Sequence, residues 1–362
     1  MKIPFNPIIN EYNQLETDIN EAVINCLKSG WYVLGKHVET FETKFAKAMN
    51  TPYCIGVASG VDAITLILMG LGISKGDDVI VPAFTAFPSI TGIQRAGATP
   101  VLVDVCSKTG LLDPTKIEKA ITKDTKAILA VHLYGQCCDL THMKTIATKH
   151  NLKIIEDCAQ STGGKYQDQY AGTHGIAGAF SFYPTKNLSA MGDGGAIITH
   201  NKALYEQCYA LRNYGQTEKN HFHYQGLNSR LDELQAAILI TKLNHLKQWN
   251  TQRNIIASYY NKTIKKSLQL EILPYNDHVY HLYVIKTKKR DDLQTKLQEK
   301  GIQTLIHYPF AIHQQPAFKT PTKTLFPNAE QLSQSVLSIP NHPQLTKKEY
   351  HYIAEQINIH GQ

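Results

Sequence analysis

Residues 178–201 read GAFSFYPTKNLSAMGDGGAIITHN, in which two strand-like runs flank a loop. Gly178–Tyr183 is β-prone, and Ala196–Thr199 is again strand-like. Pro184–Gly195, between them, is too rich in Pro, Asn and Gly to continue a strand. Lys186 therefore lies in a loop whose ends are fixed by strands and whose glycines permit close approach of a bulky ligand. A lone loop lysine is usually only a solvated side chain, so a functional role for Lys186 depends on residues elsewhere in the chain.

Upstream of this stretch, short apolar runs alternate with helical segments. Helices are expected from Val61 and over Ile90–Ala96, and the apolar runs are YCIGVAS, DVIVPAF, TPVLVDV, KAILAVHLYG and LKIIEDC. This alternation predicts βαβ units, and so an α/β fold with a mostly parallel central sheet flanked by helices. Ligands of such sheets bind at the carboxyl ends of the strands.

The two ends of the chain follow different patterns. Residues 1–50 predict an extended arm and two helices, 15–28 and 38–49, and a long helix beginning near Arg230 is expected to bridge into a second domain. After about residue 250 the pattern is α+β, with a strand in HVYHLYVIK, helices in DDLQTKLQEKG and LTKKEYHYIAEQI, and a Pro-rich loop over 309–327. We therefore expect a large α/β domain over residues 1–245 and a smaller C-terminal α+β domain over 246–362.

Composition excludes several classes of function. The chain has 362 residues, 43% of them apolar, and a formal charge of +7, but its lysines are dispersed and do not alternate with aromatic residues as in nucleic-acid binders. It contains no apolar run of membrane-spanning length and no apparent leader, so we expect a cytoplasmic protein that acts away from membranes. Its seven cysteines include no CxxC pair and are expected to be small buried side chains, and no metal site is expected.

Polar residues follow three of the predicted strands. At Ser59-Gly60-Val61 a strand ends and a helix begins, which suits an anion, although Ser59 can also be a simple helix cap. Asp157 ends an apolar strand, with Gln160 just beyond, and needs a positive partner unless it only caps a neighbouring helix. Ser181 and Lys186 belong to the third strand and its loop.

Neither a dinucleotide glycine pattern nor a P-loop is present. A lysine, an aspartate and an anion site on an α/β sheet together meet the needs of pyridoxal 5'-phosphate.

The chain resembles the sugar aminotransferases of the DegT/DnrJ/EryC1/StrS family, which are vitamin B6 enzymes of fold type I. The resemblance covers nearly the whole chain and is carried by ten stretches in order: SGWYVLGKHVETFE, ASGVDA, VPAFTAFPS, HLYGQ, IIEDCAQ, SFYPTKNLSAMGDGGA, GLNSRLDELQAAIL, HLYVI, HYPFAIHQQPAF and LSIPNHPQLT. It implies that the protein is a pyridoxal-phosphate-dependent transaminase of nucleotide-linked keto sugars, in deoxysugar biosynthesis such as that of lipopolysaccharide O-antigen.

The resemblance also implies roles for individual residues. Lys186 forms the Schiff base with the cofactor, Asp157 pairs with the pyridine nitrogen, and Gln160 lies against the ring or its hydroxyl. The phosphate is surrounded by Ser59, Gly60, Val61 and Ser181, together with Asn228 of the neighbouring subunit. The family implies a homodimer with shared active sites, L-glutamate as amino donor, and pyridoxamine 5'-phosphate as the second form of the cofactor.

One position departs from many relatives, because Ala86 stands where an aromatic residue stacks on the cofactor, and Phe87 or Phe84 could fill that space. The stretches TAFPS and YPTKNLSAMGDGGA resemble enzymes that act at C-3 of dTDP-3-keto-6-deoxyhexoses. Four aromatic or imidazole side chains are then candidates for contacts with the sugar, the last two from either subunit: Tyr183, Tyr224, His307 and Tyr308. Three alternatives stay open: a C-4 aminotransferase, a 3-dehydrase, which Lys186 argues against, and a regulatory protein that binds the cofactor without turnover.

Overall fold

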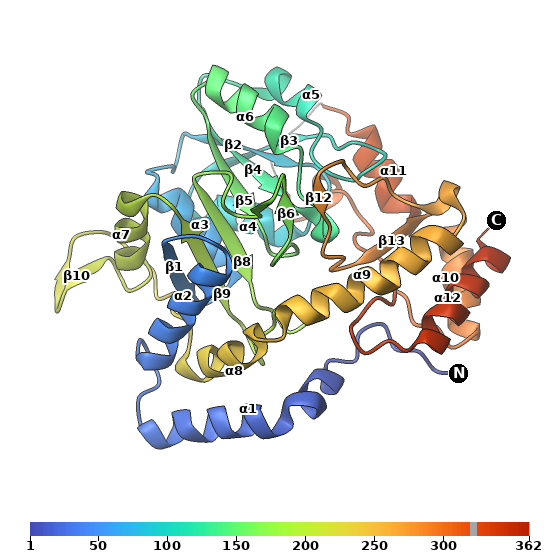
Figure 1. Ribbon diagram of the computed structural model, residues 1–362. Coiled ribbons are helices and arrows are strands. Elements are labelled where there is room, and N and C mark those ends of the chain that lie inside the picture. Colours follow the sequence, from blue (N-terminus) through green and yellow to red (C-terminus); the bar gives the residue numbers. More distant parts are fainter. Residues whose placement is uncertain (319–323, 362) are drawn as a thin grey trace.

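The structure is a computed structural model that describes residues 1–318 and 324–361. Its centre is a seven-stranded sheet in the order β1-β9-β8-β5-β4-β2-β3 (Figure 1). Within this sheet β9 alone runs antiparallel to its neighbours. The strands are β1 (Tyr53–Val57), β2 (Asp78–Pro82), β3 (Thr99–Val103), β4 (Thr125–Val131), β5 (Lys153–Asp157), β8 (Ala177–Ser181) and β9 (Gly195–Thr199). The predicted α/β fold with a mostly parallel sheet is confirmed.

Helices cover the sheet as the alternating pattern predicts. They are α1 (Ile9–Ser29), α2 (Lys36–Ala48), α3 (Gly60–Gly70), α4 (Phe87–Arg95), α5 (Pro114–Ile117), α6 (Leu140–Lys149), α7 (Lys202–Leu211) and α8 (Glu233–Leu243). Helix α3 is apolar on every side because it is buried between β8, β9, α4 and α7. Its N-terminus lies so close to β8 that a Cβ at Gly60 would be 2.7 Å from that of Ser181. Glycine is therefore required where the helix begins at the edge of the sheet.

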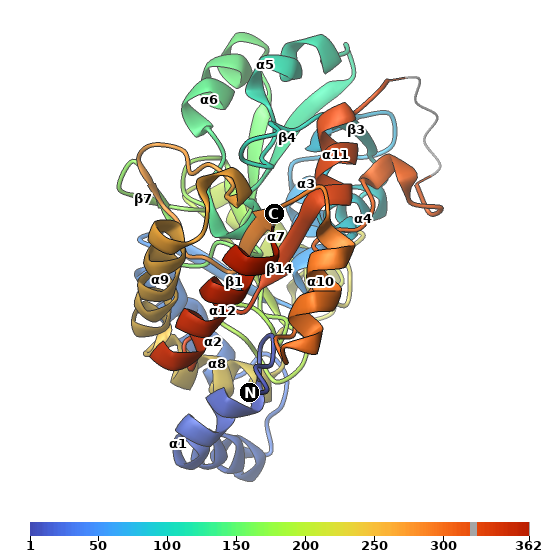
Figure 2. The ribbon, with the colours of Figure 1, turned by 90° about the vertical axis from the view of Figure 1, so that its right-hand side faces the viewer.

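The C-terminal part has a hydrophobic core of its own, formed by residues such as Ile256, Tyr260, Leu293, Leu337 and Ile353. Strands β13 and β14 pair antiparallel there, beside α9, α10 and α12. The elements of this part are α9 (Leu246–Thr263), β13 (Tyr283–Lys286), α10 (Arg290–Glu299), α11 (Pro327–Ser335), β14 (Val336–Ile339) and α12 (Lys347–His360). Both chain ends lie on the side of the molecule that carries α10 and α12 (Figure 2).

Small elements complete the fold. Two further sheets consist of β6 (Lys165–Tyr166), β7 (Gln169–Tyr170) and β12 (Asn276–Asp277), and of β10 (Gln216–Glu218) and β11 (His221–Phe222). Single turns of 3₁₀ helix occur at Glu118–Ala120, Leu133–Gly135, Lys266–Leu268 and Ile312–Gln314.

Some expectations from sequence need correction. The single bridging helix is two helices, α8 and α9, separated at Asn244 and His245, and the strand predicted in HVYHLYVIK covers only its last four residues. Part of the Pro-rich loop lies outside the described residues. All cysteines except Cys106 are buried, as expected. No helix in the described ranges is long and apolar enough to cross a membrane.

Candidate active site

A cavity of about 580 Å³ opens where β4, β5 and β8 end and α3 begins. This is the edge of the sheet at which the alternating pattern predicts a ligand. Eleven of the thirteen residues proposed from the sequence line it: Ser59, Gly60, Val61, Phe87, Asp157, Gln160, Ser181, Tyr183, Lys186, His307 and Tyr308.

Lys186 lies in the loop that follows β8. Its backbone N–H donates to the carbonyl of Tyr183, and the next residue, Asn187, donates to Asn250 Oδ1 at 2.8 Å and anchors the loop on α9. Burial lowers the pKa of Lys186 to about 8, although the carboxylate of Asp157 acts in the opposite direction. A substantial fraction of the amine is therefore neutral near pH 8, as a nucleophile or a proton carrier requires.

Asp157 is the last residue of β5 and is 6% exposed. Its Oδ2 accepts a hydrogen bond from Ser89 Oγ at 2.7 Å, and its Oδ1 accepts one from the N–H of Ala159 at 3.1 Å. No described lysine, arginine or histidine forms an ion pair with it. The carboxylate thus faces the cavity with neutral partners only, and a cationic group bound beside it would be stabilised.

The opposite wall of the cavity presents the N-terminus of α3. Ser59 Oγ accepts a hydrogen bond from the N–H of Asp62, so Ser59 is a helix cap as well as a lining residue. The N–H groups of Gly60 and Val61 have no partner within the helix, and no other described residue accepts a hydrogen bond from them. These free donors, together with the positive end of the helix dipole, suit an anion.

Gln160 is held in one orientation by two hydrogen bonds. Its Oε1 accepts from the N–H of Tyr134, and its Nε2 donates to the hydroxyl of Tyr308 at 3.0 Å. Burial raises the pKa of Tyr308 above its usual value. Tyr308 is therefore a neutral phenol at physiological pH and can act as a hydrogen-bond donor in the cavity.

Two predicted residues lie outside the cavity. Tyr224 and Asn228 are exposed and line no part of it, which leaves open a contribution from a neighbouring subunit. His307 and Tyr308 are supplied by the same chain as Lys186. Of the two stacking candidates, Phe87 lines the cavity, whereas Phe84 is buried and packs edge-on against Tyr308, with ring centroids 6.4 Å apart.

Five polar residues that line the cavity were not proposed from the sequence: Thr85, Ser89, Thr185, Asp193 and His281. Ser89 and His281 are the two whose contacts bear on the site. Ser89 lies within TAFPS and His281 within HLYVI, both among the ten family stretches, but neither pattern indicates a partner. His281 lines the cavity, and its Nδ1 lies 3.1 Å from Asn187 Oδ1. Burial and the charge of Lys186 lower the pKa of His281 well below its usual value, so its ring is neutral.

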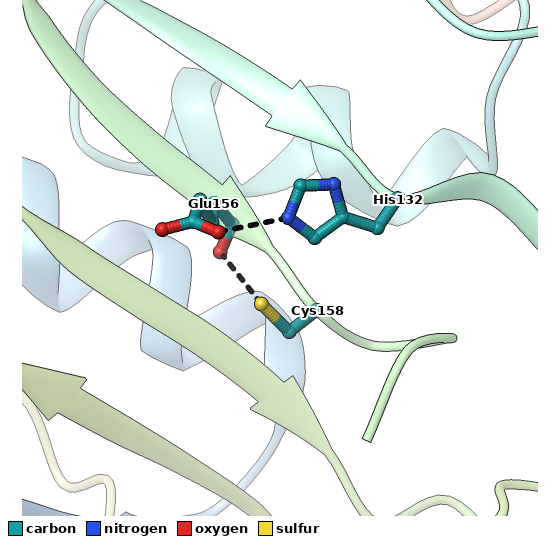
Figure 3. A group of neighbouring side chains, drawn as sticks. All are labelled: His132, Glu156 and Cys158. Atoms are coloured by element: carbon teal, nitrogen blue, oxygen red, sulfur yellow. Dashed lines mark hydrogen bonds and ion pairs between the residues drawn. The ribbon is translucent and has the colours of Figure 1, made fainter. Parts of the chain in front are cut away.

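Next to Asp157 in sequence, Glu156 is fully buried in a cluster with His132 and Cys158 (Figure 3). His132 Nδ1 accepts from the N–H of Cys138, so its Nε2 carries the proton and donates to Glu156 Oε2 at 2.9 Å. Glu156 also accepts from the N–H groups of Gly172, His174 and Gly175. The side chains of His132 and Glu156 are thus hydrogen-bonded within the protein. We infer that the cluster anchors the end of β5.

The cavity combines three binding features with one reactive amine. The free N–H groups at α3 suit a phosphate, Asp157 suits a protonated ring nitrogen, and Lys186 suits an aldehyde. Pyridoxal 5'-phosphate carries these three groups on one small ring, and the residues present fit it.

Comparisons with known proteins agree with this assignment. The model of the DegT/DnrJ/EryC1/StrS aminotransferase family matches residues 13–358. The chain is 46% identical over 362 residues, 99% of each chain, to "dTDP-3-amino-3,6-dideoxy-alpha-D-galactopyranose transaminase" of Aneurinibacillus thermoaerophilus. It is 40% identical to a "Pleiotropic regulatory protein" of Geobacillus stearothermophilus, over 99% of this chain and 98% of the relative.

One of the similar solved structures contains a bound cofactor. The crystal structure of NtdA from Bacillus subtilis, with bound cofactor PMP, superposes with a TM-score of 0.92 at 34% identity and covers all of this chain and 86% of NtdA. The match of the family model over nearly the whole length, with relatives of this identity and coverage, confirms the family predicted from the ten stretches. The chain belongs to the DegT/DnrJ/EryC1/StrS aminotransferase family.

Proposed function

We propose that the protein transfers the amino group of L-glutamate to C-3 of a dTDP-linked 3-keto-6-deoxyhexose, giving the dTDP-3-amino-3,6-dideoxyhexose. The observation that carries this proposal is that one cavity holds three features: a lysine of lowered pKa, an aspartate without an ion-pair partner among the described residues, and a helix N-terminus. The C-3 position is supported by the name of the relative at 46% identity.

Pyridoxal 5'-phosphate is the cofactor, and when bound it withdraws electrons from the substrate carbon and carries the amino group between the two substrates. In our proposal Lys186 binds its aldehyde, Asp157 its ring nitrogen, and Gln160 and Phe87 its ring. The phosphate would be held at the N-terminus of α3 by Ser59, Gly60 and Val61, with Ser181 beside them and Asn228 of a second subunit.

Lys186 is the group that moves protons. Its neutral Nζ can take a proton from the substrate carbon and deliver it to a second carbon, which requires a pKa near the working pH, as burial provides. Ser89 and the N–H of Ala159 donate hydrogen bonds to Asp157 and so orient its carboxylate toward the group that binds beside it. Tyr308, oriented by Gln160, is placed to donate a hydrogen bond to a substrate oxygen.

The sugar would contact Tyr183, His307 and Tyr308 at the open side of the cavity, and Tyr224 from a second subunit. A homodimer is supported by large apolar side chains that are exposed in the single chain. They include Trp31, Tyr32, Val33, Tyr214, Phe222 and Tyr224. We place the enzyme in the cytoplasm, in a deoxysugar pathway such as O-antigen synthesis, as the family resemblance suggests.

The test is a pair of measurements on the holoenzyme. L-Glutamate should bleach the visible absorbance of the cofactor, and addition of a 3-keto nucleotide sugar should restore it. NMR of the product should then show the amino group at C-3. A product aminated at C-4 from the 4-keto sugar would favour the C-4 aminotransferase instead.

A regulatory protein without turnover is the second candidate, because one relative at 40% identity is named as such. Turnover, unlike cofactor binding alone, also requires Lys186 to move a proton at the substrate carbon, for which a pKa of about 8 is suited. Absorbance that is unchanged by L-glutamate would favour this candidate.

A further inference from the structure

A second, smaller cavity of about 230 Å³ adjoins the active-site cavity. Thr185, His281, Leu282 and His307 line both cavities, so the two share a wall. The remaining walls come from distant parts of the chain: Phe5 and Asn6, Arg253 of α9, Gln303, Leu305, Ile339 and Asn341. The second cavity thus lies directly beside the loop that carries Lys186.

Arg253 is the charged side chain of this cavity, and it is 2% exposed. Its Nη1 donates to the carbonyl of Asn341, whereas its Nε is buried and has no hydrogen-bond partner among the described residues. No described carboxylate forms an ion pair with it; Glu11, the acid that influences it, is bonded to Lys242 at 2.8 Å. A buried guanidinium without a counterion is costly, because Arg is seldom fully buried unless it is paired.

The charge on this side chain persists at physiological pH. Burial lowers the pKa of Arg253 only to about 10, with Glu11 acting in the opposite direction. Its imidazole neighbours are neutral, because burial lowers the pKa of His307 to about 4 and that of His281 well below its usual value. The cavity is therefore lined by one positive charge that has no ion-pair partner among the described residues.

A second unpartnered atom lies at the same place. Within residues 1–318 and 324–361, Asn341 Oδ1 is buried without a hydrogen-bond partner, while Asn341 Nδ2 donates to the carbonyl of Tyr280. Buried polar atoms without partners are rare in proteins, and both side chains that carry them line this cavity.

The size and charge of the cavity select the ligand. About 230 Å³ is less than the roughly 300–1,000 Å³ of pockets that enclose drug-sized ligands, so a nucleotide-linked sugar does not fit inside. A single guanidinium matches one carboxylate, which it binds through two parallel N–H···O bonds, rather than a diphosphate. The N-terminal segment closes the cavity, since the N–H of Phe5 donates to Gln303 Oε1 and the Phe5 ring lies 5.9 Å from that of His307.

We propose that this cavity binds a carboxylate of the amino donor through Arg253 and so makes Arg253 a specificity-determining residue for the donor. The proposal rests on the transaminase function proposed above and adds a separate subsite for one of the two substrates.

The test separates the two half-reactions of the holoenzyme. In Arg253→Gln, the L-glutamate concentration for half-maximal bleaching of the cofactor absorbance should rise about 10- to 100-fold, because charge-assisted hydrogen bonds are lost. The return half-reaction, from pyridoxamine-loaded enzyme and keto nucleotide sugar, should change less than about threefold, since no donor is bound then. Arg253→Lys keeps the positive charge but lacks the two parallel N–H donors of the guanidinium, so the L-glutamate concentration for half-maximal bleaching should rise by an intermediate amount. This variant remains informative if Arg253→Gln does not fold.

Arg290→Gln is the matched control. Arg290 belongs to the same part of the chain and also donates to backbone carbonyls, those of Ser333 and Val336, but it has an acid partner in Asp291 and lines neither cavity. In Arg290→Gln, the L-glutamate concentration for half-maximal bleaching of the cofactor absorbance should equal that of the wild type.

A further arm uses glutarate, a dicarboxylate without an amino group, which should compete with L-glutamate in the wild type and much less in Arg253→Gln. Equal losses in both half-reactions, or an unchanged dependence on L-glutamate, would overturn the subsite and leave the transaminase function standing. Wild-type enzyme that does not respond to L-glutamate would refute the proposed function itself, and the subsite with it.

Discussion

The nitrogen of Lys186 determines when the site can react, and its titration can be measured. Below its pKa the amine is protonated and cannot attack an aldehyde, whereas above it the amine is neutral. In the apoenzyme, the rate of cofactor loading should therefore rise with pH and level off above about pH 8. Stopped-flow absorbance after mixing with pyridoxal phosphate measures this rate. A rate that keeps rising towards 10.5, the ordinary value for lysine, would show that burial does not lower the pKa.

Ser89 acts on the site through Asp157. Replacing Ser89 with Ala removes the 2.7 Å hydrogen bond to Oδ2, and a hydrogen bond to a charged group contributes about 1.5–3 kcal/mol. We expect at least about a tenfold loss of cofactor affinity or of kcat. Thr91→Ala on the same helix is the control, because the one bond of Thr91 Oγ1 in the described part of the chain is to the carbonyl of Phe87. If both variants retain wild-type affinity and kcat, Ser89 does not stabilise the carboxylate.

At the scale of single elements, the end of β5 depends on Glu156. Glu156→Gln puts an amide in place of a carboxylate that accepts four hydrogen bonds, so at least one buried donor faces another donor. We expect a loss of about 2–5 kcal/mol in the free energy of unfolding, measured by urea denaturation with the cofactor bound. Glu355→Gln on the exposed face of α12 should leave the stability unchanged. If Glu156→Gln were as stable as the wild type, the cluster of His132, Glu156 and Cys158 would not anchor the end of β5.

The pH dependence of that stability follows from the same contacts. Burial alone would raise the pKa of Glu156, but the hydrogen bond and electrostatic interaction with His132, the electrostatic interaction with His174 and the hydrogen bond from Gly175 outweigh it and lower the pKa below its usual value. The stabilisation is therefore complete above the unfolded value near 4.5 and is lost as the pH falls through the lower folded value. The Gln variant should lack this contribution to the acid sensitivity of the wild type.

The elements themselves were largely predictable from sequence, and the exceptions have physical causes. Buried parallel strands read as continuous apolar runs, which is why β2, β4 and β5 were expected near their observed positions. The break between α8 and α9 was missed because apolar residues continue at helical spacing through Leu243 and Leu246.

Contacts between distant residues could not be predicted in the same way. Asp157 and Lys186 could be singled out because Asp157 ends an apolar strand and Lys186 lies in the loop after another. The partners of Glu156 at Gly172–Gly175 and the place of Arg253 beside His281 exist only once the chain has folded, and no local pattern indicates them.

At the scale of the whole molecule, the proposed dimer can be tested by mixing two variants, each altered at a different residue of the shared site. If Asn228 completes the phosphate site of the neighbouring subunit, Lys186→Ala and Asn228→Ala homodimers should both be nearly inactive. Dimers reassembled from the two variants should regain activity, because one of their two sites then contains both residues. Activity of the mixture should be compared with each variant alone after the same treatment. A mixture no more active than its components would place Asn228 in its own subunit's site or outside both.

The central claim is that the cofactor is bound covalently at Lys186 and at no other lysine. Borohydride reduction of the holoenzyme followed by proteolysis and peptide mass spectrometry tests it directly. We expect the mass of the reduced cofactor on the peptide that contains Lys186, and no labelling together with no turnover in Lys186→Ala. Labelling of a different lysine, or an active Lys186→Ala enzyme, would contradict the account.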